Sequence, residues 1–221
     1  MLTDLLINIV NRFNSHHMPS QSTENKILEA AEKEFLIKGY DSARTTAIAK
    51  EAGVTHAMLH YYFRTKEKLF ERIISDKMSL LAELMLNSLT LSKLPLFEKI
   101  KDVIIRHLDF INANPSLPIF FIREVYSNPD NLKLAADALA ANAHLSVANL
   151  QTELDDAAAR GECRKVDAQM LLLDIVSLNI FSFVAQPVVE VAFPELFSDK
   201  ERFLQQRKAE NIETIMRKIK L

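Results

Sequence analysis

Four consecutive residues of this chain carry rings, and they are His60, Tyr61, Tyr62 and Phe63. Rings on an exposed helix face could contact thymine methyl groups in the major groove of DNA, and tyrosine hydroxyls could bind phosphate. If Leu59 points into a core, helical geometry places Phe63 about 40° and Tyr62 about 60° from it, so both lean inward. Tyr61 then lies about 160° from Leu59, nearly opposite. The pattern therefore predicts a helix with one packing side and one outward side.

Neighbouring residues add to the outward side. Ala57 would let the helix approach base edges closely, and Met58 could contact a thymine methyl group. Thr45, Tyr62 and Lys66 are candidates for phosphate contacts, which set the register of a protein on DNA, and Lys66 stands at a predicted helix start that attracts anions. The full set of candidate DNA-contacting residues is Arg44, Thr45, Thr55, His56, Ala57, Met58, His60, Tyr61, Tyr62 and Lys66.

The charge balance around these residues differs from that of the whole chain. The 221 residues carry a formal net charge of −2. Residues 38–68, in contrast, contain six lysines and arginines against three aspartates and glutamates. A local basic patch is consistent with phosphate binding, whereas its other interpretation is a solvated helical face.

Helices are predicted to position the candidate residues. The chain has only three glycines in 221 residues, and because turns between strands use glycine, this low content favours helices that are joined by short connections. A short helix over residues 45–52 would end at Gly53, where a tight turn needs a positive φ. Thr55 can cap a second helix over residues 56–62. This is the layout of a helix-turn-helix, whose second helix enters the major groove of DNA.

Longer helices are predicted in the rest of the chain, over residues 95–114, 131–160, 167–186 and 199–220. The expected fold class is all-α. Its expected organisation is an N-terminal extension over 1–21, a DNA-binding domain over 22–81 with the helix-turn-helix at 44–63, and a larger helical domain over 82–221. The apolar stretch 171–193 contains Asp174 and Glu190, which are costly in lipid, so a buried core helix that breaks near Pro187 is expected instead of a membrane span.

The segment ILEAAEKEFLIKGYDSARTTAIAKEAGVTHAMLHYYFRTKEKLF resembles the N-terminal domain of the TetR/AcrR family of bacterial transcriptional regulators. The matching features are the Ile-Leu-x-Ala-Ala-x-x-x-Phe first helix, Gly39-Tyr40, Ala52-Gly53-Val54 and the aromatic run that ends at Phe63. The resemblance covers roughly residues 22–80. Arg44, Ala57 and His60 depart from the residues that are common in the family at these positions, and Arg44 could supply an additional phosphate contact.

The resemblance implies a homodimer whose paired helix-turn-helices bind successive major grooves of a palindromic operator in double-stranded DNA. Repression is the usual mode of the family. The resemblance also implies that the C-terminal domain holds a pocket for a small-molecule effector, and that the last two helices form the dimer interface. Candidate pocket residues are His107, Phe110, Phe121, Tyr126, Met170 and Phe181, although rings and methionines at helical spacing are also typical of a plain core.

No pattern in the sequence indicates catalysis or a cofactor. The six histidines are scattered or adjacent in the N-terminal stretch, and no GxSxG, HExxH or glycine-rich phosphate loop occurs. The single cysteine, Cys163, cannot form an internal disulfide and does not indicate a thiol-based metal site. We therefore expect a cytoplasmic regulator that is not an enzyme and has no metal, cofactor or membrane partner. The alternative is a helical protein–protein adaptor without DNA binding, which would leave the basic motif unexplained.

Overall fold

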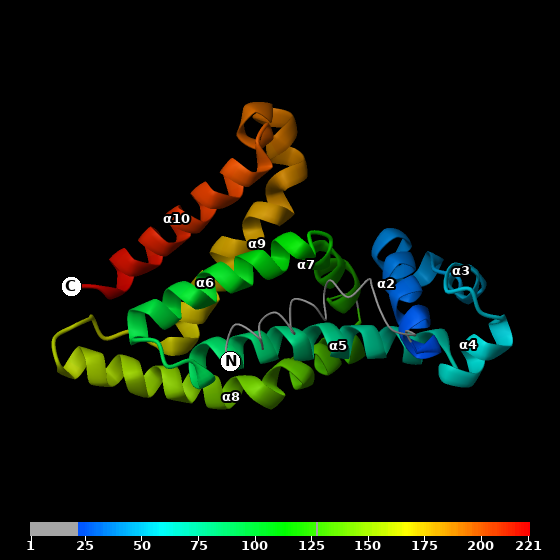
Figure 1. The fold of residues 1–221 in the computed structure, drawn as a ribbon, viewed down its shortest axis with the longest axis horizontal. Helices are drawn as coiled ribbons and strands as arrows, with labels where there is room; N and C mark the ends of the chain where they lie inside the picture. The colour runs from blue at the N-terminus through cyan, green and yellow to red at the C-terminus, as the bar shows by residue number, and fades with distance from the viewer. Residues whose placement is uncertain (1–21, 127) are drawn as a thin grey trace. The chain divides into compact units, whose positions relative to one another are not determined.

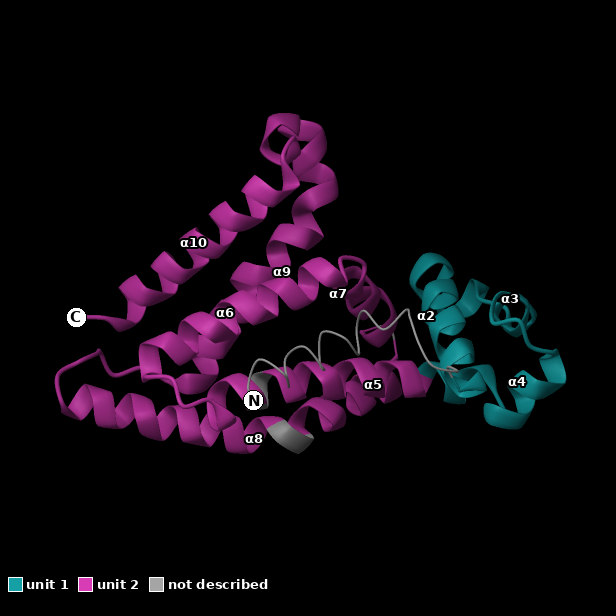
Figure 2. Cartoon of the chain, in the orientation of Figure 1, with its two compact units in different colours: residues 1–70 teal, residues 71–221 magenta. Residues whose placement is uncertain are grey.

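The computed structural model describes residues 22–126 and 128–221, and the regular elements in these residues are helices (Figure 1). The predicted all-α class is confirmed. The chain divides into two compact units, residues 1–70 (unit 1) and 71–221 (unit 2) (Figure 2). The boundary expected at residue 81 lies within one long helix, and the expected N-terminal extension over 1–21 lies outside the described residues.

The described part of unit 1, residues 22–70, contains three helices and the first turn of a fourth: α2 (Thr23–Ser42), α3 (Thr45–Glu51), α4 (His56–Tyr62) and the start of α5 (Lys66–Leu86). Ser22 caps α2 by accepting a hydrogen bond from the Asn25 amide at 3.3 Å. The helical path of α2 is interrupted at Gly39, which has φ 77°. The core of the unit includes Phe35, whose ring meets the Phe70 ring edge-on at a centroid distance of 5.0 Å.

Unit 2 continues α5 and adds η1 (Asn87–Leu91), α6 (Leu96–Ala113), α7 (Leu117–Phe120), η2 (Phe121–Val125), α8 (Pro129–Ala159), α9 (Ala168–Ala192), η3 (Pro194–Phe197) and α10 (Lys200–Ile219). The helices expected over 95–114 and 199–220 agree with α6 and α10 to within one residue at each end. Buried apolar residues of α6, α8, α9 and α10 form a common core that includes Ile104, Leu154, Leu171 and Ile215.

Helix α9 differs from the expectation in two ways. It continues through Pro187 to Ala192, because a proline removes only one backbone hydrogen bond and the following turn still closes by a 2.7 Å bond from the Phe193 amide to the Val189 carbonyl. Its apolar window is only 28% buried, although by length and composition the helix would be apolar enough to cross a membrane. The predicted break near Pro187 is therefore wrong, and α9 belongs to the core only through one side, which includes Leu171 and Ile175.

The connection from α8 to α9 contains the only cysteine of the chain. Gly161, with φ 72°, ends α8. Two residues later Cys163 is buried, and its thiol lies 3.7 Å from the Leu154 carbonyl oxygen. Burial raises the pKa of this thiol above its ordinary value.

Candidate nucleic-acid interface

The turn between α3 and α4 is closed by local hydrogen bonds. The Val54 amide donates to the Ala49 carbonyl at 2.9 Å, and Gly53 between them has φ 66°. The Thr55 hydroxyl then accepts from the Met58 amide at 3.1 Å and caps α4, as its sequence predicts. These contacts set where α4 begins and therefore which of its residues point outward.

Helix α4 has the two sides that the sequence predicts. Leu59 is fully buried and Phe63 is 7% exposed. Tyr61, in contrast, is 83% exposed, and its ring packs edge-on against that of the half-exposed Tyr62 at 5.4 Å. The other expected outward residues of α4, which are His56, Ala57, Met58 and His60, are exposed as well. The structure thus places an uncharged and partly aromatic surface on one side of α4.

Two histidines of α4 have defined partners. The His56 Nε2 atom lies 3.0 Å from the hydroxyl of Thr45 at the start of α3, and the His56 and His60 rings meet edge-on at 4.4 Å. The His60 Nδ1 atom lies 3.1 Å from the Arg64 carbonyl oxygen. Because a carbonyl can only accept, His60 Nδ1 carries a hydrogen, and Nε2 of the neutral ring is left as an acceptor. Such an acceptor suits the exocyclic amino group of adenine or cytosine.

Lys66 is engaged within unit 1. Its ammonium group donates to the carbonyl oxygens of Tyr40, Asp41 and Ala43 at 2.6, 3.2 and 3.1 Å, and it lies 4.5 Å from the centroid of the Tyr40 ring. An ammonium group has three hydrogens, so these contacts use its full donor capacity. Lys66 here joins the start of α5 to the end of α2, and its contact with phosphate stays a prediction.

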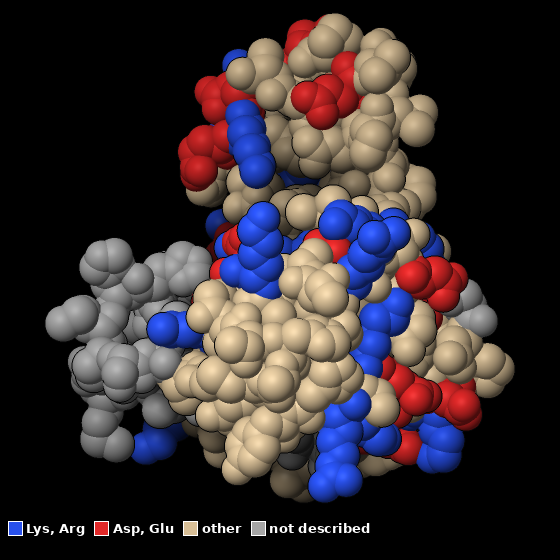
Figure 3. All heavy atoms as spheres, turned by 90° about the vertical axis from the view of Figure 1, so that its right-hand side faces the viewer, with Lys and Arg blue, Asp and Glu red and all other residues tan. Residues whose placement is uncertain are grey.

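Other cations around α3 and α4 are available for phosphate. Within the described part of the chain, the side chains of Arg44, Lys50 and Arg64 have no hydrogen bond or ion pair. Lys33 and Lys38, in contrast, pair with Glu51 and Glu34 respectively. Figure 3 views the side that carries α3 and α4, where basic side chains border an area of uncharged ones. Lys50 and Arg64 were not singled out by the sequence motif, and the local charge balance was the only signal for them.

Glu34 sets the start of α3. Its carboxylate accepts from the Lys38 ammonium at 2.8 Å and from the Arg44 backbone amide at 3.3 Å. The hydrogen bond from Lys38 is the main reason that the pKa of Glu34 lies below its ordinary value, and the bond from Arg44 acts in the same direction. The ionised carboxylate therefore holds the residue that precedes α3 and leaves the Arg44 guanidinium exposed.

The six predicted pocket residues of unit 2 are not brought together in its interior. His107 and Phe110 are buried on α6, and Phe121 is half-buried. Tyr126, Met170 and Phe181 are 74%, 54% and 70% exposed, respectively. As ligand contacts all six stay predictions, but only the α6 pair faces an enclosed environment.

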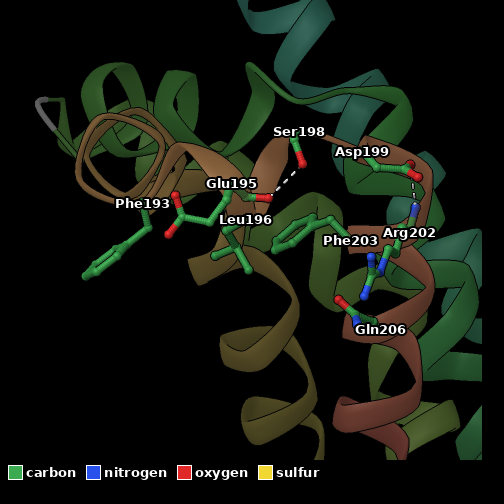
Figure 4. Close-up of a pocket in the computed structure, with 8 residues that line it drawn as sticks. All are labelled: Phe193, Glu195, Leu196, Ser198, Asp199, Arg202, Phe203 and Gln206. Carbon is green, nitrogen blue, oxygen red and sulfur yellow. Dashed lines mark hydrogen bonds between the residues drawn. The ribbon is translucent and has the colours of Figure 1, made fainter.

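A hollow of about 400 Å³ lies at the connection between α9 and α10 (Figure 4). Its lining combines the rings of Phe193 and Phe203 with the side chains of Arg202 and Gln206, and it includes none of the six predicted residues. The Asp199 carboxylate in this hollow caps α10 by accepting from the Arg202 amide at 3.0 Å. Among the residues that the structure describes, no cluster of His, Cys, Asp and Glu could hold a metal ion.

Comparison with known proteins places the helix-turn-helix in a family. Residues 27–73 match the family model described as bacterial regulatory proteins, tetR family. The HTH-type transcriptional regulator YdgC of Bacillus subtilis is 36% identical over 61 residues, which are 27% of this chain and 31% of YdgC. The fatty acid metabolism regulator protein of the same organism is 28% identical over 109 residues, which are 49% of this chain and 55% of that protein. The matches thus span less than two thirds of these relatives.

Solved structures share the fold along most of the chain. The transcriptional regulator FadR from Bacillus subtilis, in complex with stearoyl-CoA, has a TM-score of 0.63 at 19% identity and covers 86% of this chain and 96% of its own. The fatty acid degradation regulator FadR from Bacillus halodurans has a TM-score of 0.61 at 18% identity, with coverage of 88% and 97%. At these identities the likeness shows a common fold alone.

Proposed function

We propose that this chain, whose N-terminal unit is a DNA-binding domain of the tetR family of bacterial regulatory proteins, is a transcriptional regulator that binds a palindromic operator as a homodimer. The observation that carries the proposal is α4, a capped helix with Leu59 buried on one side and Tyr61 exposed on the other. A helix with one buried and one exposed side after a glycine turn is suited to the major groove. Repression in the cytoplasm is the expected mode.

The proposed DNA contacts fall into two groups. Ala57, Met58, His60 and Tyr61 would face base edges from the outward side of α4. Arg44 would bind phosphate, together with the two cations that the structure adds, Lys50 and Arg64. Thr45, Thr55, His56 and Tyr62 border these groups. Lys66, which is occupied by carbonyls, would support the interface from within unit 1.

Helix α9 supports the proposed homodimer. Its exposed apolar residues recur at helical spacing, and they are Met170, Leu173, Phe181, Val188 and Val191. An apolar stripe of this kind along a helix is an unusual feature of a monomer surface, and in a symmetric dimer each copy would cover the stripe of the other. The proposed interface is the α9 and α10 pair of each protomer, which would form a four-helix seam.

A small-molecule effector is part of the proposal. The likeness of fold to a FadR structure that holds stearoyl-CoA supports an effector site in unit 2 of this chain. Binding would change the DNA affinity if the effector favours one of two states of the dimer. The relatives and structural neighbours described above are regulators, and no described feature favours the adaptor alternative.

A mobility-shift experiment tests the proposal. We expect the full chain to retard DNA fragments that flank its gene, with a binding constant that falls steeply as salt rises, because cations displace counterions from phosphates. Absence of salt-sensitive retardation across all fragments, and in a selection from random-sequence DNA, would contradict the proposal.

Two variants sharpen the experiment. Tyr61→Ala is expected to keep wild-type stability, since its ring is 83% exposed, but to change the selected base sequence. Phe63→Ala, on the packing side, is expected to lower the free energy of unfolding by about 3 kcal/mol. If Tyr61→Ala selects the wild-type sequence with wild-type affinity, the assignment of the outward side is wrong.

A further inference from the structure

A chain of hydrogen-bonded polar side chains crosses the interior of unit 2 and joins three helices. The Arg207 guanidinium of α10 donates to the Asn211 side-chain oxygen at 2.8 Å, and the Asn211 amide donates to the Asn179 oxygen of α9 at 2.8 Å. The Asn179 amide nitrogen then lies 3.0 Å from the Ile104 carbonyl oxygen and 3.1 Å from His107 Nδ1, both of α6. Asn179 and His107 are fully buried, and Asn211 is 2% exposed.

The direction of every bond in this polar chain is determined by its two ends. Arg207 can only donate, so the atom of Asn211 that faces it is the oxygen, and the amide nitrogen of Asn211 must point to Asn179. Independently, the Ile104 carbonyl can only accept, so the atom of Asn179 beside it is the nitrogen. Both assignments agree, and each side-chain amide donates toward α6.

His107 must then accept at Nδ1, because the Asn179 amide hydrogen points at that atom. A neutral imidazole that accepts at Nδ1 carries its hydrogen on Nε2. A proton on Nδ1 would face the Asn179 hydrogen, so the ring stays neutral, and burial in addition lowers the pKa of His107 to about 4. The polar chain therefore ends in a neutral Nε2–H donor.

This donor has no partner among the described residues, although its residue is fully buried. More than nine in ten buried polar groups of native proteins are paired, because an unpaired buried donor is costly. On α6 itself, the buried residues next to His107, which are Ile104, Leu108 and Phe110, carry no acceptor side chain. An uncharged oxygen is the partner that full burial of this donor favours, because a carboxylate would lose its hydration there.

We propose that His107 Nε2–H is the recognition donor of a small-molecule site in unit 2, and that it takes an uncharged carbonyl oxygen on an otherwise apolar ligand. The inference rests on the effector in the proposed function and specifies its chemistry: ketones, esters, thioesters and amides qualify. Alkylamines do not, because a cationic amine has no lone pair for the donor. Asn179 and Asn211 act as positioning residues that hold the His107 ring in its tautomer.

The test uses the full chain with ¹⁵N-labelled histidine and methyl octanoate, octanoate and octylamine as probes. Long-range ¹H–¹⁵N spectra should show His107 protonated at Nε2 and free at Nδ1 between pH 5.5 and 7.5. Methyl octanoate should shift this Nε2 signal and raise the melting temperature, while octylamine leaves both unchanged. His107→Phe should bind methyl octanoate about tenfold more weakly, because the hydrogen bond is lost. His144→Phe, at an exposed histidine of α8, is the matched control and should bind like wild type.

Several results would overturn the inference. The first is a spectrum that shows His107 protonated at Nδ1, and the second is tighter binding of octanoate than of methyl octanoate. The third is an Nε2 signal that does not shift when methyl octanoate is added, which would indicate a buried water as the only partner. If His107→Phe is unfolded, His107→Gln keeps an N–H donor and should retain ester binding. DNA retardation without any probe tests the regulator separately. If the protein retards DNA but fails these tests, only the proposed His107 site is refuted. If the protein binds the ester but does not retard DNA, the proposed regulator function is refuted.

Discussion

At the scale of single residues, Lys66 and Lys50 are used differently in unit 1. Lys66 gives all three of its ammonium hydrogens to carbonyls at the end of α2, whereas Lys50 is exposed and has no ion pair in the described part of the chain. Lys66→Met is expected to lower the free energy of unfolding by about 1–3 kcal/mol, because three carbonyls lose their donor. Chemical denaturation of the full chain measures this change.

Lys50→Met is the matched control for that measurement. It should change stability by less than about 0.5 kcal/mol, as exposed substitutions usually do. It should instead weaken binding to all DNA sequences alike. The slope of the logarithm of the DNA-binding constant against the logarithm of the salt concentration should become less steep by about one, since one phosphate contact is lost. The opposite pattern, with a stable Lys66→Met protein that binds DNA weakly, would make Lys66 a phosphate contact as the sequence predicts.

At the scale of elements, Gly53 ends α3 in a left-handed conformation with φ 66°, and a Cβ added there would meet no atom within 4 Å. Gly53→Ala would therefore cost only backbone strain, about 1–2 kcal/mol. Gly161, with φ 72° and equally open surroundings, ends α8 in unit 2. Gly161→Ala should therefore lower the melting temperature of the protein about as much as Gly53→Ala does.

DNA binding separates the two glycine variants. Gly53→Ala strains the turn that aims α4, so it should weaken retardation at temperatures where the protein is still folded. Gly161→Ala should leave retardation unchanged under the same conditions. Equal DNA binding by both variants would show that the turn tolerates the strain without moving α4.

The helix-turn-helix was predictable from the sequence because its determinants are local. Gly53 and Thr55 act on backbone groups a few residues away, and the buried Leu59 sets which residues of α4 face outward. The partners of Lys66 lie 23 to 26 residues earlier in the chain, so the sequence motif could not reveal them. The same reason hides the contact of His107 with Asn179, at a separation of 72 residues.

At the scale of the whole molecule, the exposed side of α9 bears on assembly. Phe181 is 70% exposed in the middle of the apolar stripe. Phe181→Glu should place two carboxylates in the proposed dimer seam and shift the protein toward monomers, as light scattering would measure. The monomer should also bind the operator more weakly, because both half-sites are no longer held together.

Tyr126→Glu is the control for this prediction, because Tyr126 is equally exposed in unit 2 but lies outside α9. It should leave the mass in solution unchanged. If Phe181→Glu keeps the mass of the wild-type protein, the α9 stripe is not the interface, and a different surface or a monomeric state would have to explain palindromic binding.

The burial of Cys163 has a practical consequence for spectroscopy. Thiol-directed labels react with the thiolate, and this thiol is both enclosed and held in its protonated form by a raised pKa. Spin labels should therefore attach selectively to a cysteine introduced at an exposed position of α3, as in Thr46→Cys, without removal of the native one. Pulsed electron paramagnetic resonance on the labelled protein would give the distance between the two helix-turn-helices of a dimer, with and without ligand.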